Sequence, residues 1–158
     1  MEVQISKATI EQIDTLMKWR MEVLSEVFVD WKQENQSEIY AANLKYYNEM
    51  LVSEHHIAVF ANVGGVTVGC GGVCIYQEMP SPDNPSGYCA YLMNIYTRKE
   101  FRGQGIAEQV VKYLIRQVRK RNIDKIYLET SESGRILYEK IGFENMVDYM
   151  KMPREVVQ

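Results

Sequence analysis

Hydrophobic and polar residues follow regular patterns through the first third of the chain. The run Val3–Lys7 is typical of a first strand. A long amphipathic helix is predicted next, with Thr9 and Gln12 in the spacing of a capping box at its start. Its apolar stripe consists of Ile10, Ile13, Leu16, Met17, Leu24, Val27 and Phe28. A second helix is expected over residues 37–51, with Ser37 as its cap.

Two apolar runs follow, over residues 57–63 and Val66–Gln77, and both predict strands. Gly64 and Gly65 separate them, and a glycine pair between two apolar runs is a strong signal of a β-hairpin. Glycines weaken a strand interior and mark a bulge or the close approach of another backbone. The second run contains three of them, Gly69, Gly71 and Gly72.

The middle of the chain changes from loop to strand to helix. Residues 79–87 contain three prolines and predict a loop. Residues 91–97 are apolar, β-branched and aromatic, which favours a strand. From Gly105 onward the period becomes helical, and the apolar stripe is that of a helix packed on a sheet. The stripe consists of Ile106, Val110, Val111, Leu114, Ile115 and Val118.

The last third predicts a strand over residues 125–130, a helix that contains Tyr138, and a final strand over residues 145–151. The expected order of elements is therefore β-α-α-β-β-β-α-β-α-β. No internal repeat or linker divides the chain, so we expect a single domain over residues 1–158. Its class is α/β in the broad sense, with α+β character.

Composition narrows the class of protein further. A chain of 158 residues with 46% hydrophobic content can fill one core of ordinary size. The net charge of −3 argues against non-specific nucleic-acid binding, which needs a basic face. No apolar run approaches the ~18 residues of a membrane span, and the first residues lack a signal-peptide core. We therefore expect a cytoplasmic protein that binds neither nucleic acid nor membrane.

Cysteine and histidine do not form a metal-binding or disulfide pattern. The three cysteines, Cys70, Cys74 and Cys89, are an odd number and suggest no disulfide framework. Cys70 and Cys74 would share one face of a strand at a separation of ~13 Å, too far for a bridge without a bend. His55 and His56 are adjacent and would point to opposite faces. We expect no bound metal.

The joint between the predicted strand and the central helix carries the chemistry. Residues 102–107 read Arg-Gly-Gln-Gly-Ile-Ala, and the glycines allow a tight turn and a close approach to a ligand. The unpaired N–H groups of the first helical turn would form a donor site for an anion. Arg98 and Lys99 add basic residues next to Arg102. We interpret this joint as a phosphate-binding site.

Three phosphate-binding motifs compete for the joint. A P-loop is absent, because no Gly-x-x-x-x-Gly-Lys-Ser/Thr run exists. A dinucleotide fingerprint would need a third glycine where Glu108 stands. The remaining pattern, Arg/Gln-x-x-Gly-x-Gly/Ala, is satisfied by Arg102, Gly105 and Ala107, and it resembles the acetyl-CoA-binding motif of the GNAT (general N-acetyltransferase) superfamily.

A second segment supports this resemblance. Residues 137–143, Leu-Tyr-Glu-Lys-Ile-Gly-Phe, resemble the family's Leu-Tyr-x-x-x-Gly-Phe segment, in which a helix carries a tyrosine and ends at a glycine. The order of predicted elements is also the GNAT order. The resemblance implies a central mixed, mostly antiparallel sheet flanked by about four helices. It further implies an acyltransferase that uses acetyl-CoA as its cosubstrate.

The resemblance also implies roles for individual residues. Tyr138 matches the family's general-acid tyrosine. Many relatives place a glutamate base early in the motif strand, but residues 88–91 contain no carboxylate. We therefore choose Glu129 as the base, acting through water. Further candidates are Glu22, Glu26 and Tyr91. Ser131 stands where relatives often carry an asparagine that steadies the cofactor arm. The implied cofactor-binding set is Ile95, Tyr96, Thr97, Arg102, Gly103, Gln104, Gly105, Ile106, Ala107 and Ser131.

The predicted substrate is a primary amine of a small molecule, which attacks acetyl-CoA directly in a ternary complex. The loop over residues 79–87 could cover the acceptor, and aromatic residues of the first two helices could form its wall: Trp19, Trp31, Tyr40, Tyr46 and Tyr47. The alternatives are a protein or peptide N-acetyltransferase, and a non-catalytic acyl-CoA-binding regulatory module. A homodimer is possible.

Overall fold

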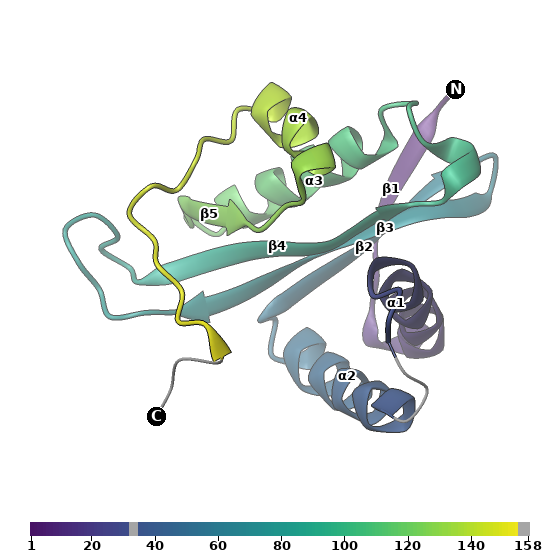
Figure 1. Ribbon diagram of the computed structural model, residues 1–158, viewed down its shortest axis with the longest axis horizontal. Helices are drawn as coiled ribbons and strands as arrows, with labels where there is room; N and C mark the ends of the chain where they lie inside the picture. Colours follow the sequence, from purple (N-terminus) through teal and green to yellow (C-terminus); the bar gives the residue numbers. More distant parts are fainter. Residues whose placement is uncertain (32–34, 155–158) are drawn as a thin grey trace.

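Five strands form one twisted sheet in the computed structural model, which describes residues 1–31 and 35–154 (Figure 1). The order in the sheet is the order along the chain, β1-β2-β3-β4-β5. Neighbouring strands are antiparallel except β4 and β5, which are parallel. The prediction of a mixed, mostly antiparallel sheet is confirmed. The strands are β1 (Val3–Lys7), β2 (His56–Val63), β3 (Val66–Gln77), β4 (Tyr88–Thr97) and β5 (Lys125–Leu128).

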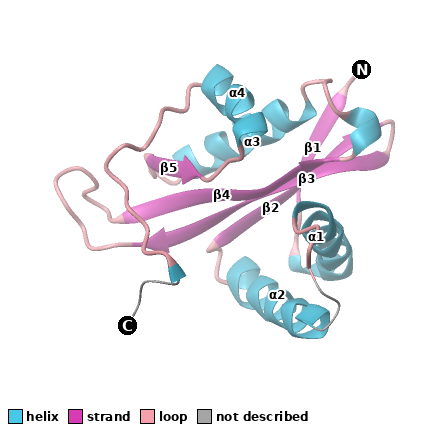
Figure 2. Ribbon diagram, viewed as in Figure 1, coloured by secondary structure: helices cyan, strands magenta, loops and turns pink. Residues whose placement is uncertain are grey.

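Four helices cover the two faces of this sheet in pairs (Figure 2). Helices α3 (Ile106–Arg119) and α4 (Glu132–Ile141) lie on one face, and α1 (Ile13–Val27) and α2 (Gln36–Val52) lie on the other. Each face has its own apolar core. The core under α3 is built by strand residues and by the predicted helical stripe, including Val110, Val111, Leu114 and Val118. The core under α1 includes Leu16, Met17, Trp19, Tyr47 and Phe60.

Turn and cap chemistry sets the limits of several elements. The Gln12 side chain accepts a hydrogen bond from the Thr9 N–H at 3.1 Å, at a short 3₁₀ turn, η1 (Ile10–Gln12), that leads into α1. Gly64 and Gly65 have φ of 56° and 80°, as the predicted hairpin between β2 and β3 requires. Helix α2 begins at Gln36, one residue before the predicted start, so Ser37 is not its cap.

The glycines of β3 have the role that the sequence indicated. The pairing of β3 with β4 shifts its register between Cys70 and Gly72, where Gly71 lies opposite two residues of β4, Asn94 and Ile95, which form the bulge. A Cβ on Gly71 would lie 2.5 Å from Cγ1 of Val110 in α3. The missing side chain therefore allows α3 to pack directly on the sheet.

Strands β4 and β5 separate part-way along their length. Their parallel pairing runs from Cys89 with Lys125 to Leu92 with Leu128, where β5 ends, and β4 then continues to Thr97 paired only with β3. Among the described residues, no strand pairs with this end of β4 on its β5 side. The separation leaves backbone groups of β4 open to a further extended chain.

The predicted strand over residues 145–151 is not formed. Val147 and Met150 of this segment are 84% and 99% exposed, although their pattern predicted a strand. Side chains alone attach the segment: Arg135 donates to Asn145, and Tyr149 packs 6.3 Å from Tyr127 between ring centroids. A strand needs a row of backbone partners, which these side-chain contacts do not supply. None of the described helices is long and apolar enough to cross a membrane.

Candidate active site

The glycine-rich joint lies between β4 and α3, after a 3₁₀ turn, η3 (Lys99–Phe101). Gly103 and Gly105 have φ of 75° and 76°, in the left-handed region that favours glycine. A Cβ at either position would meet no atom within 4 Å, so the space beside both glycines is open. Gly105 is the N-cap of α3 and supplies no side-chain cap, which leaves the first-turn N–H groups without that partner.

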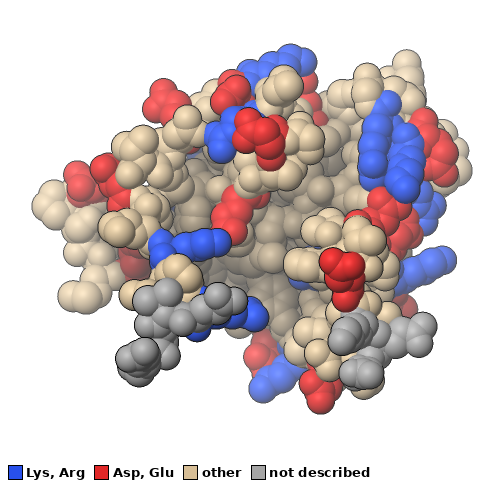
Figure 3. Space-filling model, viewed as in Figure 1, with Lys and Arg blue, Asp and Glu red and all other residues tan. Residues whose placement is uncertain are grey.

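The basic residues at the joint are paired with acids of α1. Arg98 donates through Nε and Nη2 to the two carboxylate oxygens of Glu22, each at 2.9 Å. Arg102 donates to the Thr97 carbonyl at 2.9 Å and to Glu26 at 3.2 Å. Basic and acidic side chains accordingly lie side by side over this part of the surface (Figure 3). The joint therefore carries less free positive charge than its sequence suggested.

The same ion pairs involve two of the residues that were candidates for the general base, Glu22 and Glu26. The hydrogen bond from Arg98 lowers the pKa of Glu22 below its usual range, although burial opposes the shift. Glu26 contacts Arg102 at 3.2 Å and Lys99 at 3.9 Å. A carboxylate held by a guanidinium is a weak proton acceptor. Both carboxylates attach α1 to the joint, and the lowered pKa of Glu22 disfavours that residue as a base.

The side chains at the end of β4 are mostly engaged in the cores. Tyr96 is buried, with its ring 6.1 Å from that of Trp19 and its hydroxyl donating to Glu22 at 3.4 Å. The Thr97 hydroxyl is buried without a hydrogen-bond partner among the described residues. The Ile95 side chain packs against the core under α3. Contacts of these three residues with a ligand would therefore be made mainly by their backbone.

Sequence reasoning missed a contact between α1 and β4. Asn94, at the bulge of β4, has a φ of 60°, which few residues other than glycine adopt. Its side-chain oxygen accepts a hydrogen bond from Arg20 Nη1 at 2.9 Å. An asparagine inside an apolar strand was the available signal, because asparagine is disfavoured in strands and tolerates a positive φ. Nothing in the sequence indicated Arg20 as its partner.

Tyr138 lies in α4, and Ser131 immediately precedes this helix. The Ser131 side chain accepts a hydrogen bond from the Gly134 N–H at 3.4 Å, so Ser131 is the N-cap of this helix. Gly142 is the C-cap, with a φ of 116°, as predicted. Tyr138 is half-buried with its ring 5.7 Å from Phe143, and burial raises the pKa of its hydroxyl. It stays protonated at neutral pH.

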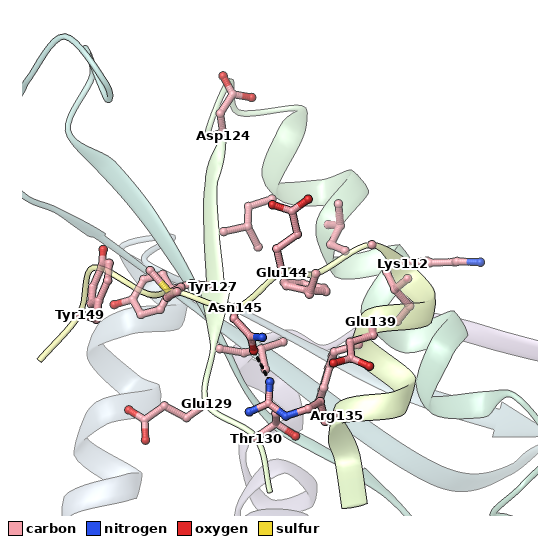
Figure 4. Close-up of a pocket in the computed structure, with 18 of the residues that line it drawn as sticks. Lys112, Asp124, Tyr127, Glu129, Thr130, Arg135, Glu139, Glu144, Asn145 and Tyr149 are labelled. Carbon is pink, nitrogen blue, oxygen red and sulfur yellow. Dashed lines mark hydrogen bonds between the residues drawn. The ribbon is translucent and has the colours of Figure 1, made fainter. Parts of the chain in front are cut away.

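Tyr138 also lines a cavity of about 1100 Å³ between α3, β5, α4 and the C-terminal segment. Figure 4 shows the Arg135 side chain reaching Asn145 across this cavity. Glu129 follows β5, is exposed, and lies on the same side of the strand as Tyr127. Burial, together with the charge of Glu129, raises the pKa of Tyr91 to about 12. Glu129 is therefore close enough to Tyr91 for its charge to act on the phenol. Glu129 and Tyr138 are not hydrogen-bonded to each other.

Cysteine and histidine side chains occupy the other face of the sheet. All three cysteines are free thiols. His56 is buried, and its Nδ1 is 2.8 Å from the hydroxyl of Tyr46, which also donates to Cys74 at 2.9 Å. Among residues 1–31 and 35–154, no group of three or more His, Cys, Asp or Glu side chains could hold a metal ion.

A second cavity of about 680 Å³ lies between the C-terminal end of α1 and α2. Of the aromatic residues expected to form an acceptor wall, Trp31 lines it, whereas Trp19 and Tyr47 are buried in the core. The loop over residues 79–87 contributes nothing to its lining. That loop lies at the start of β4, away from the joint (Figure 1), so the expected cover over the acceptor is not formed there.

The sequence model of the acetyltransferase (GNAT) family matches residues 13–143, which is most of the chain. The chain belongs to the GNAT family. A protein from Clostridium acetobutylicum that is described as a predicted acetyltransferase, solved with acetyl-CoA, has a TM-score of 0.84 at 24% identity, covering 96% of each chain. This GNAT domain is also similar to glucosamine-6-phosphate N-acetyltransferase from Arabidopsis thaliana, with a TM-score of 0.71, 18% identity, and coverage of 98% and 99%.

A further solved structure is that of AAC(6')-Iy in complex with the bisubstrate analogue CoA-S-monomethyl-acetylneamine. Its TM-score is 0.73 at 17% identity, covering 98% of this chain and 99% of that chain. At these identities the likeness establishes the GNAT fold and no substrate. No curated protein sequence matches the chain.

Proposed function

We propose that this GNAT protein is an N-acetyltransferase that moves an acetyl group from acetyl-CoA to the primary amine of a small molecule, with residues 1–158 acting as one catalytic domain. One observation carries the proposal. The open glycine joint at the start of α3 follows, after one 3₁₀ turn, the end of β4 whose β5-side edge has no partner strand among the described residues. A pyrophosphate donor site and an unpaired strand edge are the two features that an extended CoA thioester needs.

The residues at the joint fit the pyrophosphate of acetyl-CoA. The first-turn N–H groups from Ile106 onward lack a side-chain cap, and the space beside Gly103 and Gly105 is open. Glu108, in the same turn, accepts hydrogen bonds from Lys112 and Lys140, each at 2.7 Å, which offsets its charge near a bound phosphate. Gln104 and Ala107 complete the turn. Arg102 would support it through the Thr97 carbonyl.

The uncovered end of β4 would bind the pantetheine arm through main-chain hydrogen bonds. The arm would bind backbone groups of Ile95, Tyr96 and Thr97 on the edge of β4 beyond the end of β5, apart from the Thr97 carbonyl, which already accepts a hydrogen bond from Arg102. A backbone N–H there would polarise the thioester carbonyl, and such fixed donors are a large electrostatic contribution to acyl transfer. Acetyl-CoA supplies the activated acetyl group; Ser131 would steady the arm only weakly, because its hydroxyl already caps α4.

Two side chains would handle the protons. The amine nitrogen bonds to the acetyl carbon as the carbon–sulfur bond breaks, and the departing thiolate takes a proton from Tyr138. The attacking amine first loses a proton, through water, toward Glu129, which is exposed beside Tyr91. Direct attack in a ternary complex is supported by the bisubstrate analogue bound to the related fold.

A small acceptor is supported by the size of the available site. The cavity between α1 and α2 is about 680 Å³, which is in the range of small-molecule sites. Two proteins of the same fold carry small-molecule ligands or substrates in their names, an amino sugar phosphate and a neamine derivative. A protein substrate would instead call for an extended docking face.

The test is a screen of amines with acetyl-CoA, read by release of free thiol. We expect turnover with at least one class of small primary amine and none with lysine-rich peptides. Binding of acetyl-CoA without turnover on any amine would favour a regulatory module. Turnover on peptides alone would favour a protein acetyltransferase.

A further inference from the structure

The cavity between α1 and α2 has an apolar wall, and Arg20 is the one cation among its described lining residues. Exposed apolar side chains gather around it: Val27, Phe28 and Val29 are 62%, 58% and 86% exposed. Leu24, Trp31 and Ile39 extend the same lining. Single exposed apolar residues are ordinary on a protein surface, but a contiguous set around a cavity marks a binding site. This wall suits an apolar group of a ligand.

Arg20 supplies the cation at the base of this cavity. Its Nε donates to Oδ1 of Asn43 at 2.9 Å, and its Nη1 donates to Oδ1 of Asn94 at 2.9 Å. The Asn43 amide is itself fixed, because its Nδ2 donates to the Ile39 carbonyl at 2.8 Å. Two of the five N–H donors of the guanidinium therefore have partners, and these hold it in one orientation.

The charge of Arg20 is not neutralised by these partners. Both are neutral amide oxygens, and Arg20 forms no ion pair with a carboxylate of residues 1–31 or 35–154. Its field reaches His56, whose pKa is lowered to about 4 by burial and, to a smaller extent, by the charge of Arg20. A half-buried guanidinium held only by amides is suited to bind an anion bidentately.

The geometry points to an acceptor that is an α-amino acid with an apolar side chain, whose carboxylate binds Arg20 and whose side chain lies against Phe28, Trp31 and Ile39. This inference rests on the proposed N-acetyltransferase function and names its substrate class. An α-carboxylate and an apolar side chain are the two groups that this cavity can satisfy together.

The position of Arg20 also links the cavity to the reacting atoms. Its other partner, Asn94, is the positive-φ residue of the β4 bulge and directly precedes Ile95, at the uncovered end of the strand. In an α-amino acid the amine is attached to the carbon next to the carboxylate. A carboxylate bound to Arg20 would therefore direct the amine toward the backbone that holds the thioester.

Other ligand chemistries fit the cavity less well. Asp30 also lines it and could attract a second ammonium group, but its side chain is exposed and its field is screened by solvent. An amino sugar phosphate would match the charge of Arg20, but its hydroxyls would face Leu24, Phe28 and Ile39 without hydrogen-bond partners. Both alternatives give distinct results in the test.

The experiment compares each apolar amino acid with the amine that lacks only its carboxylate. L-leucine, L-methionine and L-phenylalanine are assayed beside isopentylamine, 3-(methylthio)propylamine and phenethylamine. The readout is the ratio of kcat/KM for the acid to kcat/KM for its amine. In the natural protein we expect this ratio to favour the acid by about 100-fold, the size of a charge-assisted hydrogen-bond pair.

The Arg20→Met variant should remove most of this preference. We expect the ratio to fall by about 100-fold, while calorimetric affinity for acetyl-CoA stays unchanged. A general loss of rate from the contact with Asn94 cancels in the ratio. Lys45→Met is the matched control, because Lys45 is 76% exposed on α2 and outside the cavity lining. Arg20→Lys keeps the charge but loses the planar guanidinium, so it should give an intermediate ratio. This variant replaces Arg20→Met in the experiment if Arg20→Met does not fold.

The outcomes separate this inference from the function on which it rests. Equal turnover of acids and amines, or a ratio that Arg20→Met leaves unchanged, overturns the substrate class and leaves the N-acetyltransferase intact. Preference for polyamines that Asp30→Asn abolishes, or for amino sugar phosphates, overturns it as well. Bound acetyl-CoA with no amine acetylated would overturn both.

Discussion

The hydroxyl of Tyr138 combines packing with a raised pKa. Its ring lies edge-on to Phe143, with 5.7 Å between centroids, and burial shifts the pKa of the phenol upward. A phenol that stays protonated at neutral pH can donate a proton and cannot accept one. The proton is therefore present when the thiolate departs, although its transfer is uphill in pKa because the conjugate thiol has a pKa of about 8.5.

We predict that Tyr138→Phe lowers kcat by about 100-fold, because the ring still packs and only the proton donor is lost. The affinity for acetyl-CoA, measured by calorimetry, should not change. Tyr88→Phe is the control, since Tyr88 is 38% exposed on the opposite end of β4 and should keep full activity. Near-normal kcat in Tyr138→Phe would leave this residue a packing role alone.

The sequence predicted the backbone conformation of some residues, but not the interaction partners of others. The conformations of Gly105 and Gly142 follow from local turn chemistry, and both were predicted. The roles of Arg98 and Arg102 were not, because their partners Glu22 and Glu26 are more than seventy residues away in the chain. A local pattern shows that a charge is present, but not what neutralises it.

At the scale of elements, the glycines of β3 determine how α3 meets the sheet. A methyl group on Gly71 would lie 2.5 Å from Val110 Cγ1 and 2.9 Å from Ile95 Cδ1. We predict that Gly71→Ala lowers the free energy of unfolding by about 1–3 kcal/mol, the usual cost of overpacking a core. Urea denaturation measures it. The double variant Gly71→Ala/Val110→Ala should lose less than the sum of the two single variants, and strict additivity would contradict the steric account.

Helix α2 and strand β2 are joined by a buried histidine. His56 is 5% exposed and hydrogen-bonded to Tyr46, and burial lowers its pKa from 6.5 to about 4. Between these values the unfolded chain binds the proton and the folded chain does not. Stability due to this group should therefore be complete above pH 6.5 and fall by up to about 3 kcal/mol as the pH drops to 4.

The pH dependence can be measured by urea denaturation across this range. His56→Gln should lose this part of the pH dependence, whereas His55→Gln, at the exposed neighbouring position, should keep it. Identical profiles for the natural protein and His56→Gln would show that His56 titrates normally.

Elements were predictable where their signals are local. Periodicity predicts the apolar stripes of the helices and the order of the strands, and turn residues predict the hairpin at Gly64 and Gly65. The strand expected over residues 145–151 failed, because strand formation depends on a partner and not only on the pattern of side chains. The same limit applied to β5, which ends at Leu128 rather than at residue 130.

At the scale of the whole molecule, the two halves of the proposed reaction meet at one point of the sheet. The joint before α3 and the cavity between α1 and α2 are both connected to the end of β4, through Thr97 and Asn94 respectively. The sequence indicated the first of these sites from a continuous motif. It indicated the second only in part: a wall from the first two helices was expected and Trp31 lines the cavity, but Arg20 and Asn43 join the lining only because the two helices pack together.

The central claim is that the joint binds the pyrophosphate of acetyl-CoA, and calorimetry on a matched pair of variants tests it most directly. Gly105→Glu and Gly65→Glu place the same side chain at glycines with φ of 76° and 80°, each with open space around it. Both bear similar backbone strain, but only Gly105 lies at the joint. We predict that Gly105→Glu abolishes acetyl-CoA binding in a folded protein and that Gly65→Glu binds normally. Unchanged affinity in folded Gly105→Glu would contradict the cofactor site.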